Sequence, residues 1–268
     1  MLPVQRARRS QALAVGLLSG VCALAMVACS SAQPGTAVSP SLDQSSTLAT
    51  GLDSARIGGK KKWVSGAAGE GVSDGALAKW RGRKVGIAAT WNEDFDSQDQ
   101  YWTLQPGAEY GSWRGDLDIA VGSIYQERGE TWANAAKGDY DARWAASLQA
   151  LKTAWTGRPG TLYIRFAHEF NGDWFEWQVH RSEVRDFVRS WRRYRALQKS
   201  ILPSAKLVFC PNDGTVRVDG YDWRKAFPGK KHVDLMSVDS FNQWPFAKTK
   251  AEFQAKIMGK DVFGAPLG

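Results

Sequence analysis

The sequence predicts an α/β fold, a (β/α)8 TIM barrel of which the chain holds about six of the eight strands. From about residue 62 onward, short apolar runs typical of buried strands alternate with longer stretches whose apolar residues recur at helical spacing. Such alternation implies βαβ units and a parallel sheet, either doubly wound or closed into a barrel. No glycine-rich phosphate-binding loop follows a predicted strand, and this favours the barrel.

The predicted strands are six short, mostly apolar runs, as expected for strands that are covered on both faces. They are Lys62–Gly66, Lys84–Ala89, Leu117–Ser123, Thr161–Ala167, Ala205–Cys210 and Val233–Asp239. About 29 residues follow the last run. Two further strands with their helices need roughly 60 residues. We therefore expect a C-terminally incomplete barrel.

Two long helices are predicted from stripes of apolar residues at helical spacing. The first lies between Ser182 and Ile201, where the arginines fall mostly off the stripe and Pro203 ends the pattern. The second stripe runs from Tyr140 to Trp155. We expect most of the aromatic residues in these stripes to belong to the core.

Residues 1–28 predict an export signal, because a basic stretch precedes an apolar run that is short for a membrane-spanning helix. The ending Met26–Ser31 resembles a bacterial lipobox, in which Cys29 would carry lipid. A simple secretory signal that is cut near Ala28 is the alternative. Residues 29–61 are rich in Ser, Thr, Pro and Ala and predict a flexible tether. We expect an exported bacterial protein, lipid-anchored or secreted, with its barrel domain in residues 62–268.

Composition narrows the classes of protein further. With 43% hydrophobic and 23% charged residues, the chain is globular rather than disordered. The net charge of +8 includes three arginines of the predicted leader, and the remaining excess forms no long basic block, which argues against a nucleic-acid partner. Thirteen Trp residues suit an aromatic core or a surface that stacks on sugar rings. Cys210 remains as the one cysteine of the folded part, so we expect no intrachain disulfide.

The stretch from Arg165 to Trp177 carries the chemistry. A β-run ends in Arg165, His168 and Glu169 and then passes into a Trp-rich loop. In barrels of this kind the reactive residues lie at the C-terminal ends of the strands. A carboxylic acid among aromatic side chains can hold a raised pKa and donate a proton to a leaving oxygen. Trp174 and Trp177 offer flat apolar faces for sugar rings.

The pattern Arg165-x-x-His168-Glu169-Phe-Asn171-Gly172-x-Trp174-Phe-x-Trp177 resembles the acid/base strand of glycoside hydrolase family 26. Members of this family are mostly endo-β-1,4-mannanases on (β/α)8 barrels. Weaker similarity extends over about residues 62–268 and includes Val238–Asn242. The resemblance implies that Glu169 is the general acid/base, that His168 contacts substrate beside it, and that Trp174 is the sugar platform near the point of cleavage.

Further substrate-binding positions are implied at Arg165, Asn171, Trp177 and Phe241. Arg165 would orient the carboxylates from below. Phe241 stands where the family usually has a Tyr that hydrogen-bonds the nucleophile, so this contact is absent or replaced. Trp91 and Trp244 follow predicted strand ends and either line subsites or pack. The structural alternatives are an ion pair between Glu169 and Arg165 and a buried, purely structural His168.

A retaining glycosidase needs a second carboxylate about 5–5.5 Å from the acid/base. The family places it as a Glu on the seventh strand, which we expect beyond Gly268. Four acidic residues of this chain are other candidates: Asp173, Glu176, Asp213 and Asp239. Asp173 and Glu176 follow Glu169 too closely to face it across a barrel mouth, and the family gives Asp239 no nucleophilic role.

The resemblance therefore implies a retaining endo-β-glycanase that hydrolyses β-1,4-mannan-type polysaccharide. One alternative is a non-catalytic polysaccharide-binding lipoprotein on a decayed barrel. Another is a related glycosidase that acts on glucan, xylan or an exopolysaccharide. The three His residues show no metal-ligand spacing, so we expect no catalytic metal and no cofactor. We expect a monomer that touches the membrane only through its lipid anchor.

Overall fold

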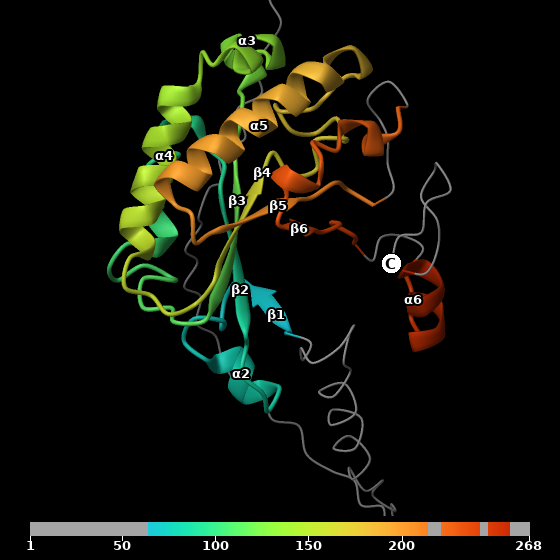
Figure 1. The fold of residues 1–268 in the computed structure, drawn as a ribbon. Coiled ribbons are helices and arrows are strands. Elements are labelled where there is room, and N and C mark those ends of the chain that lie inside the picture. The colour runs from blue at the N-terminus through green and yellow to red at the C-terminus, as the bar shows by residue number, and fades with distance from the viewer. Residues whose placement is uncertain (1–63, 214–220, 242–245, 258–268) are drawn as a thin grey trace, which may run out of the picture. The chain divides into compact units, whose positions relative to one another are not determined.

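The computed structural model describes residues 64–213, 221–241 and 246–257 (Figure 1). The predicted signal peptide, the tether and the lipidation site at Cys29 lie outside these residues, as do Asn242 and Trp244. Within the three described segments, none of the helices has both the length and the apolar character that a membrane span requires.

The core of the fold is a sheet of six parallel strands. In chain order the strands are β1 (Gly66–Ala68), β2 (Ile87–Asn92), β3 (Asp116–Val121), β4 (Leu162–Phe166), β5 (Lys206–Phe209) and β6 (Leu235–Met236). Each strand pairs in parallel with the next one along the chain. A doubly wound sheet would reverse its strand order at a switch point, whereas this order is that of a barrel wall. The sheet is a partial (β/α) barrel, as predicted.

All six predicted strands exist, but their bounds differ from the prediction. β2 continues through three residues that follow the apolar run, because the polar side chains of Thr90 and Asn92 form hydrogen bonds with the loop that follows. Thr90 Oγ1 donates to Thr103 Oγ1 at 3.2 Å, and Asn92 Nδ2 donates to the backbone oxygen of Gln98 at 2.9 Å. β6 has two residues instead of seven, and beyond it the pairing continues as a single bridge between Asn212 and Asp239.

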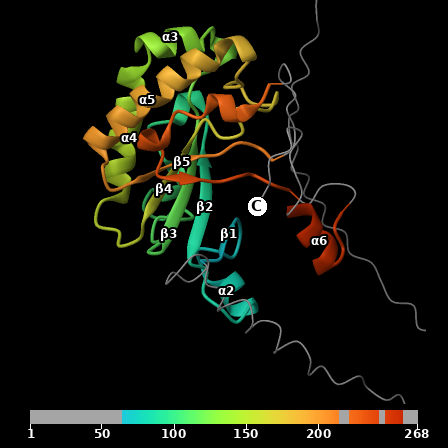
Figure 2. The same ribbon diagram turned by 45° about the vertical axis from the view of Figure 1, so that its right-hand side comes forward.

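Five helices are described, and Figures 1 and 2 show α3, α4 and α5 together on one face of the sheet. The α-helices are α2 (Ala76–Trp80), α3 (Trp132–Lys137), α4 (Asp141–Trp155), α5 (Val184–Ile201) and α6 (Lys250–Ile257). Short 3-10 turns occupy Phe95–Ser97, Trp102–Leu104, Gln126–Arg128, Arg181–Glu183, Trp223–Ala226 and Lys230–His232. The two long helices read from the apolar stripes are confirmed, and a 3-10 turn forms the first residues of the predicted α5.

Aromatic side chains fasten α4 and α5 to the sheet. Phe166, the last residue of β4, meets Trp144 of α4 edge-on with ring centroids 5.2 Å apart and stacks on Tyr194 of α5 at 3.9 Å. Trp191 of α5 lies against the ring of Phe209 on β5 at 5.3 Å. All five side chains are buried, and each contributes about 1.5–3 kcal/mol on a transfer scale. This packing fixes the carboxyl ends of β4 and β5.

Successive residues of a strand point to opposite faces of the sheet. Because Phe166 packs against the helices, its neighbour Arg165 points to the other face. There Arg165 meets Asp118 of β3, and its guanidinium carbon lies 6.0 Å from the centre of the Trp91 ring on β2. Charged groups therefore gather on the sheet face opposite α4 and α5.

Candidate active site

The backbone turns sharply where β4 ends. Ala167 and Glu169 have φ angles of 50° and 52°, in the left-handed region that residues with a Cβ rarely adopt. Such a conformation costs on the order of 1–3 kcal/mol per residue and persists where surrounding contacts enforce it, most often at functional sites. Here the Glu169 N–H donates to the backbone oxygen of Cys210 at 2.8 Å. The turn therefore holds Glu169 in a fixed orientation at the edge of the sheet where β4 ends.

The carboxyl of Glu169 is nearly buried and is held by neighbouring side chains. Trp174 Nε1 donates to Glu169 Oε2 at 2.6 Å. Burial raises the pKa of Glu169; hydrogen bonds from Asn212 and Trp174 act against this rise, and the hydrogen bond and charge of Asp239 add to it. A carboxyl that retains its proton above the usual range is suited to donate it to a leaving group.

Arg165 supports this site through intermediate carboxylates. Its Nε donates to Asp118 Oδ1 at 2.8 Å, and its Nη1 donates to Asp239 Oδ2 at 2.9 Å. Asp239 in turn hydrogen-bonds the side chain of Glu169. Among the described ion pairs there is none between Arg165 and Glu169, so the structural ion pair considered from the sequence is not formed.

Asn171 lies under the site. It is buried, and the sequence prediction that it binds substrate does not agree with its surroundings. Its Nδ2 donates to the backbone oxygen of Asn212 at 3.0 Å, and its Oδ1 accepts from the Asn212 N–H at 2.8 Å. This reciprocal pair joins the turn after β4 to the turn after β5.

The two tryptophans of the loop have different places. Trp174 is 42% exposed, so its ring can serve as a platform beside Glu169. Trp177 is 3% exposed, stacks on Phe175 with ring centroids 4.6 Å apart, and donates its indole N–H to the backbone oxygen of His168 at 2.8 Å. The prediction that Trp177 presents a face to sugars is therefore wrong, because this ring forms the floor beneath His168.

Two more aromatic rings are exposed at the carboxyl ends of strands. Trp91 of β2 is 49% exposed, and Phe241, which follows β6, is 58% exposed. The carboxyl ends of parallel strands meet at the same edge of a sheet, so these rings share an edge with Trp174. Together they place exposed, flat aromatic surfaces at this edge of the sheet.

Glu93, Asp118 and Asn212 are site residues that the sequence analysis missed. Glu93 follows β2 directly, and its Oε1 lies 3.3 Å from Nε2 of the buried His168. The rule that selected His168 and Glu169, a polar residue just after a strand, also applies to Glu93. The prediction ended β2 at Ala89, which placed Glu93 too far along the following loop.

The four acidic residues considered as nucleophiles are all described. Asp173 is exposed, Glu176 accepts a hydrogen bond from the backbone of a neighbouring loop, and Asp213 bonds to a side-chain hydroxyl. Asp239 accepts a hydrogen bond from Arg165 Nη1 at 2.9 Å and raises the pKa of Glu169 through its hydrogen bond and charge. In the described segments no three His, Cys, Asp or Glu side chains gather as metal ligands.

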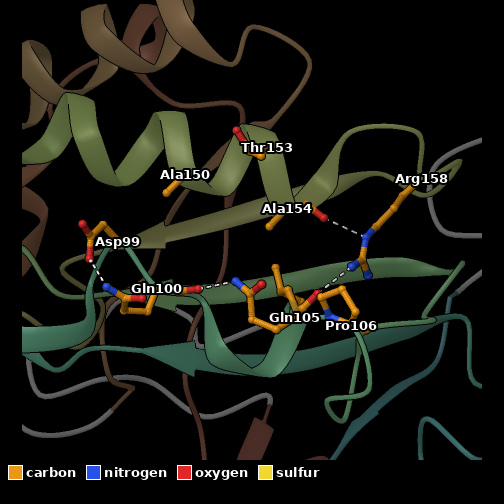
Figure 3. A pocket seen from close by; sticks show the side chains of 10 residues that line it. Asp99, Gln100, Gln105, Pro106, Ala150, Thr153, Ala154 and Arg158 are labelled. Carbon is orange, nitrogen blue, oxygen red and sulfur yellow. Dashed lines mark hydrogen bonds between the residues drawn. The ribbon is translucent and has the colours of Figure 1, made fainter.

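A separate hollow lies between α4 and residues 99–111 (Figure 3). It has a volume of about 510 Å³ and contains none of the predicted site residues. Arg158 donates there to the backbone oxygens of Ala154, Tyr110 and Leu104 at 2.9, 2.6 and 2.9 Å. Its guanidinium therefore holds the loop in place.

Comparison with solved structures identifies similar folds. A Cellulomonas fimi endo-β-1,4-mannanase double mutant matches with a TM-score of 0.50 and 15% identity over 73% of this chain and 51% of that protein. A β-mannanase from a symbiotic protist of the termite Reticulitermes speratus, complexed with gluco-manno-oligosaccharide, matches with the same TM-score and identity over 73% of this chain and 69% of that one. No family model matches the sequence, and no curated protein matches it significantly.

GH26C from a Muricauda species is similar over 67% of this chain and 59% of its own length, at 15% identity and a TM-score of 0.48. The chain thus spans between half and six tenths of the Cellulomonas and Muricauda proteins. At these identities the likeness concerns the fold. The described part of the chain has a glycoside hydrolase family 26-like fold, that of a partial (β/α) barrel.

Proposed function

We propose that this chain carries the acid/base centre of a retaining endo-β-glycanase that acts on β-1,4-mannan, with Glu169 as the proton donor. The observation that carries the proposal is a nearly buried carboxyl at the end of β4 whose Oε2 accepts a hydrogen bond from an exposed indole. The fold, which resembles that of two β-mannanases, supports the same assignment.

The hydrogen bond from Trp174 supports a choice between the two carboxyl oxygens. Because Oε2 accepts from the Trp174 N–H, we propose that Oε1 carries the proton of the neutral acid. As the glycosidic C1–O bond breaks, this proton moves to the departing oxygen. In the second step the Glu169 carboxylate takes a proton from the water that attacks C1 and regains its original state.

The covalent step requires a second carboxylate that attacks C1 and forms a glycosyl-enzyme intermediate. We propose that it lies beyond residue 268, on the strand where the family resemblance places its nucleophilic Glu. The positions of Asp173 and Glu176 support this location, because both follow Glu169 too closely in the chain to face it across a barrel mouth.

Mannan is proposed as substrate because two solved structures of similar fold are an endo-β-1,4-mannanase and a β-mannanase complexed with gluco-manno-oligosaccharide. The exposed rings of Trp91, Trp174 and Phe241 would stack on successive pyranose faces. We further propose that residues 1–28 export the protein and that Cys29 anchors it to the membrane, which would place the site at the cell surface, where polysaccharides are met.

Glu169→Ala in the full-length protein tests the assignment. We expect a loss of activity on mannan of about 10²–10⁴-fold, the usual contribution of a general acid. Azide should restore cleavage of an activated aryl mannoside and yield a glycosyl azide, since such a leaving group needs no proton. Glu127→Ala, at an exposed carboxylate, is the matched control and should keep activity. Wild-type turnover by Glu169→Ala would contradict the proposal.

Polysaccharide binding without hydrolysis is the second candidate function. It is favoured by the exposed rings of Trp91, Trp174 and Phe241. Affinity electrophoresis in mannan gels separates the two functions. Retardation without release of reducing ends would favour binding. In mannan gels the Trp174→Ala variant should then migrate faster than wild type, and its mobility should be the same with and without mannan.

A further inference from the structure

Glu93 and His168 form a buried contact that the proposed reaction leaves unused. Glu93 Oε1 lies 3.3 Å from His168 Nε2, and the two side chains are 24% and 3% exposed. The backbone oxygen of Glu93 accepts from Tyr125 Oη at 2.8 Å, which fixes the start of the loop after β2. The contact therefore joins the carboxyl ends of β2 and β4.

Both side chains have polar atoms without partners. Within the described residues, the buried Glu93 Oε1 accepts no hydrogen bond, although it lies 3.3 Å from His168 Nε2, and the buried His168 Nδ1 has no partner. The His168 ring packs against Phe175 and Trp177, with centroids 4.6 and 5.6 Å away, so its surroundings are aromatic. A buried carboxyl oxygen and an imidazole nitrogen in contact are stable when one proton lies between them.

The charges around the pair decide where that proton resides. Burial raises the pKa of Glu93 to about 7; Arg165 acts against the rise, and the carboxylates of Glu169 and Asp239 add to it. Burial and the neighbouring Arg165 lower the pKa of His168 to about 3. The carboxyl is thus the more basic of the two groups and retains the proton, and the imidazole stays neutral.

We propose that Glu93 is a positioning residue of the acid/base centre, whose carboxyl proton is donated to His168 Nε2 and holds the imidazole in the Nδ1–H tautomer beside Glu169. In this state the pair adds no charge beside the acid Glu169 and the carboxylate of Asp239. Once Glu93 ionises, a further negative charge faces Glu169. The catalytic meaning of the pair rests on the proposed function, whereas the shared proton does not.

Nitrogen NMR of the histidines tests the shared proton without any assay of activity. The full chain is labelled with ¹⁵N-histidine, and the resonances of its three His residues are assigned by elimination with His180→Gln and His232→Gln. In the wild type we expect a neutral His168 between pH 5 and 8, with its proton on Nδ1 below about pH 7. Its Nε2 shift should show one inflection near pH 7, as Glu93 ionises.

Two variants distinguish the effect of the Glu93 carboxyl proton from the effect of its side-chain packing. Glu93→Gln keeps the shape and an N–H that can donate to Nε2, so the tautomer should persist and the inflection should disappear. Glu93→Ala removes both, so a mixture of tautomers should appear. Glu127→Gln is the control and should leave the His168 signals unchanged. Persistence of the inflection in Glu93→Gln, or titration of His168 to an imidazolium near pH 6.5, would overturn the proposal.

Activity is measured on the same variants, so that failure of the two proposals can be distinguished. If mannan is not cleaved but the NMR inflection disappears in Glu93→Gln, the proposed function fails and the Glu93–His168 pair stands. If mannan is cleaved with Glu169 as acid while the inflection persists in Glu93→Gln, the function stands and the pair is wrong.

Discussion

Trp174 Nε1 lies 2.6 Å from Glu169 Oε2, so the ring proposed to carry a sugar and the carboxyl proposed to protonate it are hydrogen-bonded to each other. The two residues are only five positions apart in the chain, and the backbone at Glu169 lies in the left-handed region. A sugar stacked on Trp174 would therefore lie at a fixed place relative to the proton donor. Binding and protonation depend on one local structure.

Trp174→Phe should raise the pKa of Glu169, because the variant keeps an aromatic ring but loses the N–H that stabilises the carboxylate. The indole N–H stabilises the charged carboxylate more than the neutral acid, so its removal favours the acid. Carbon NMR of ¹³C-labelled glutamate side chains gives the titration directly. Trp102→Phe, at another exposed Trp, serves as control, and an unchanged or lower pKa in Trp174→Phe would contradict the hydrogen bond.

Glu93→Gln should make the protein more stable than wild type at alkaline pH. A carboxyl whose pKa rises to about 7 on folding is favoured as the acid, so its contribution to stability is fully present below its unfolded value and is lost as pH rises through 7. The uncharged amide avoids this loss, which is on the order of 3 kcal/mol by pH 9. Urea unfolding at pH 5 and pH 9 measures it. Equal stability differences at the two pH values would count against the raised pKa.

His168 should make the wild type sensitive to acid. Its pKa falls to about 3 on folding, so its neutral form contributes stability above pH 6.5 that is lost as pH falls from 6.5 toward 3. The loss is on the order of 3 kcal/mol. His168→Gln should lose less stability than wild type between pH 7 and pH 4 in urea titrations, whatever its absolute stability. His232→Gln, at a less buried histidine, is the comparison, and parallel curves for His168→Gln and wild type would refute the assignment.

Phe166→Ala should destabilise the protein strongly, because this ring joins β4 to both α4 and α5. Removal of a buried Phe costs about 3–5 kcal/mol. Trp80→Ala, at an exposed position, should change the free energy of unfolding by less than about 0.5 kcal/mol. Thermal unfolding followed by circular dichroism measures both. A loss below about 1 kcal/mol for Phe166→Ala would show that the aromatic cluster does not fix the strand.

The parts of the fold that follow from local pattern could be predicted from the sequence. The apolar runs located six strands, and the helical stripes located α4 and α5. Glu169 and His168 were identified because a strand pattern ends directly before them. The end of β2 could not be predicted, because Thr90 and Asn92 are polar and become buried only through partners on a following loop. Glu93 was missed for this reason.

The different places of Trp174 and Trp177 could not be predicted either. Both lie in one short loop, and neither hydropathy nor spacing distinguishes a ring that faces solvent from one that packs beneath a histidine. That difference depends on Phe175, which stacks on Trp177, and on the backbone oxygen of His168, which accepts its indole N–H. These contacts depend on the turn after β4. Its left-handed residues are Ala167 and Glu169 rather than glycines, so the sequence does not indicate the turn.

The bonds between the turns after β4 and β5 bear on the order in which the site assembles. Glu169 N–H reaches Cys210, and Asn171 exchanges two hydrogen bonds with the backbone of Asn212. Until β5 has joined the sheet, the left-handed backbone at Glu169 has no partner there to hold it. The orientation of Glu169 thus depends on residues some forty positions later in the chain, and we expect it to be lost when β5 separates from the sheet.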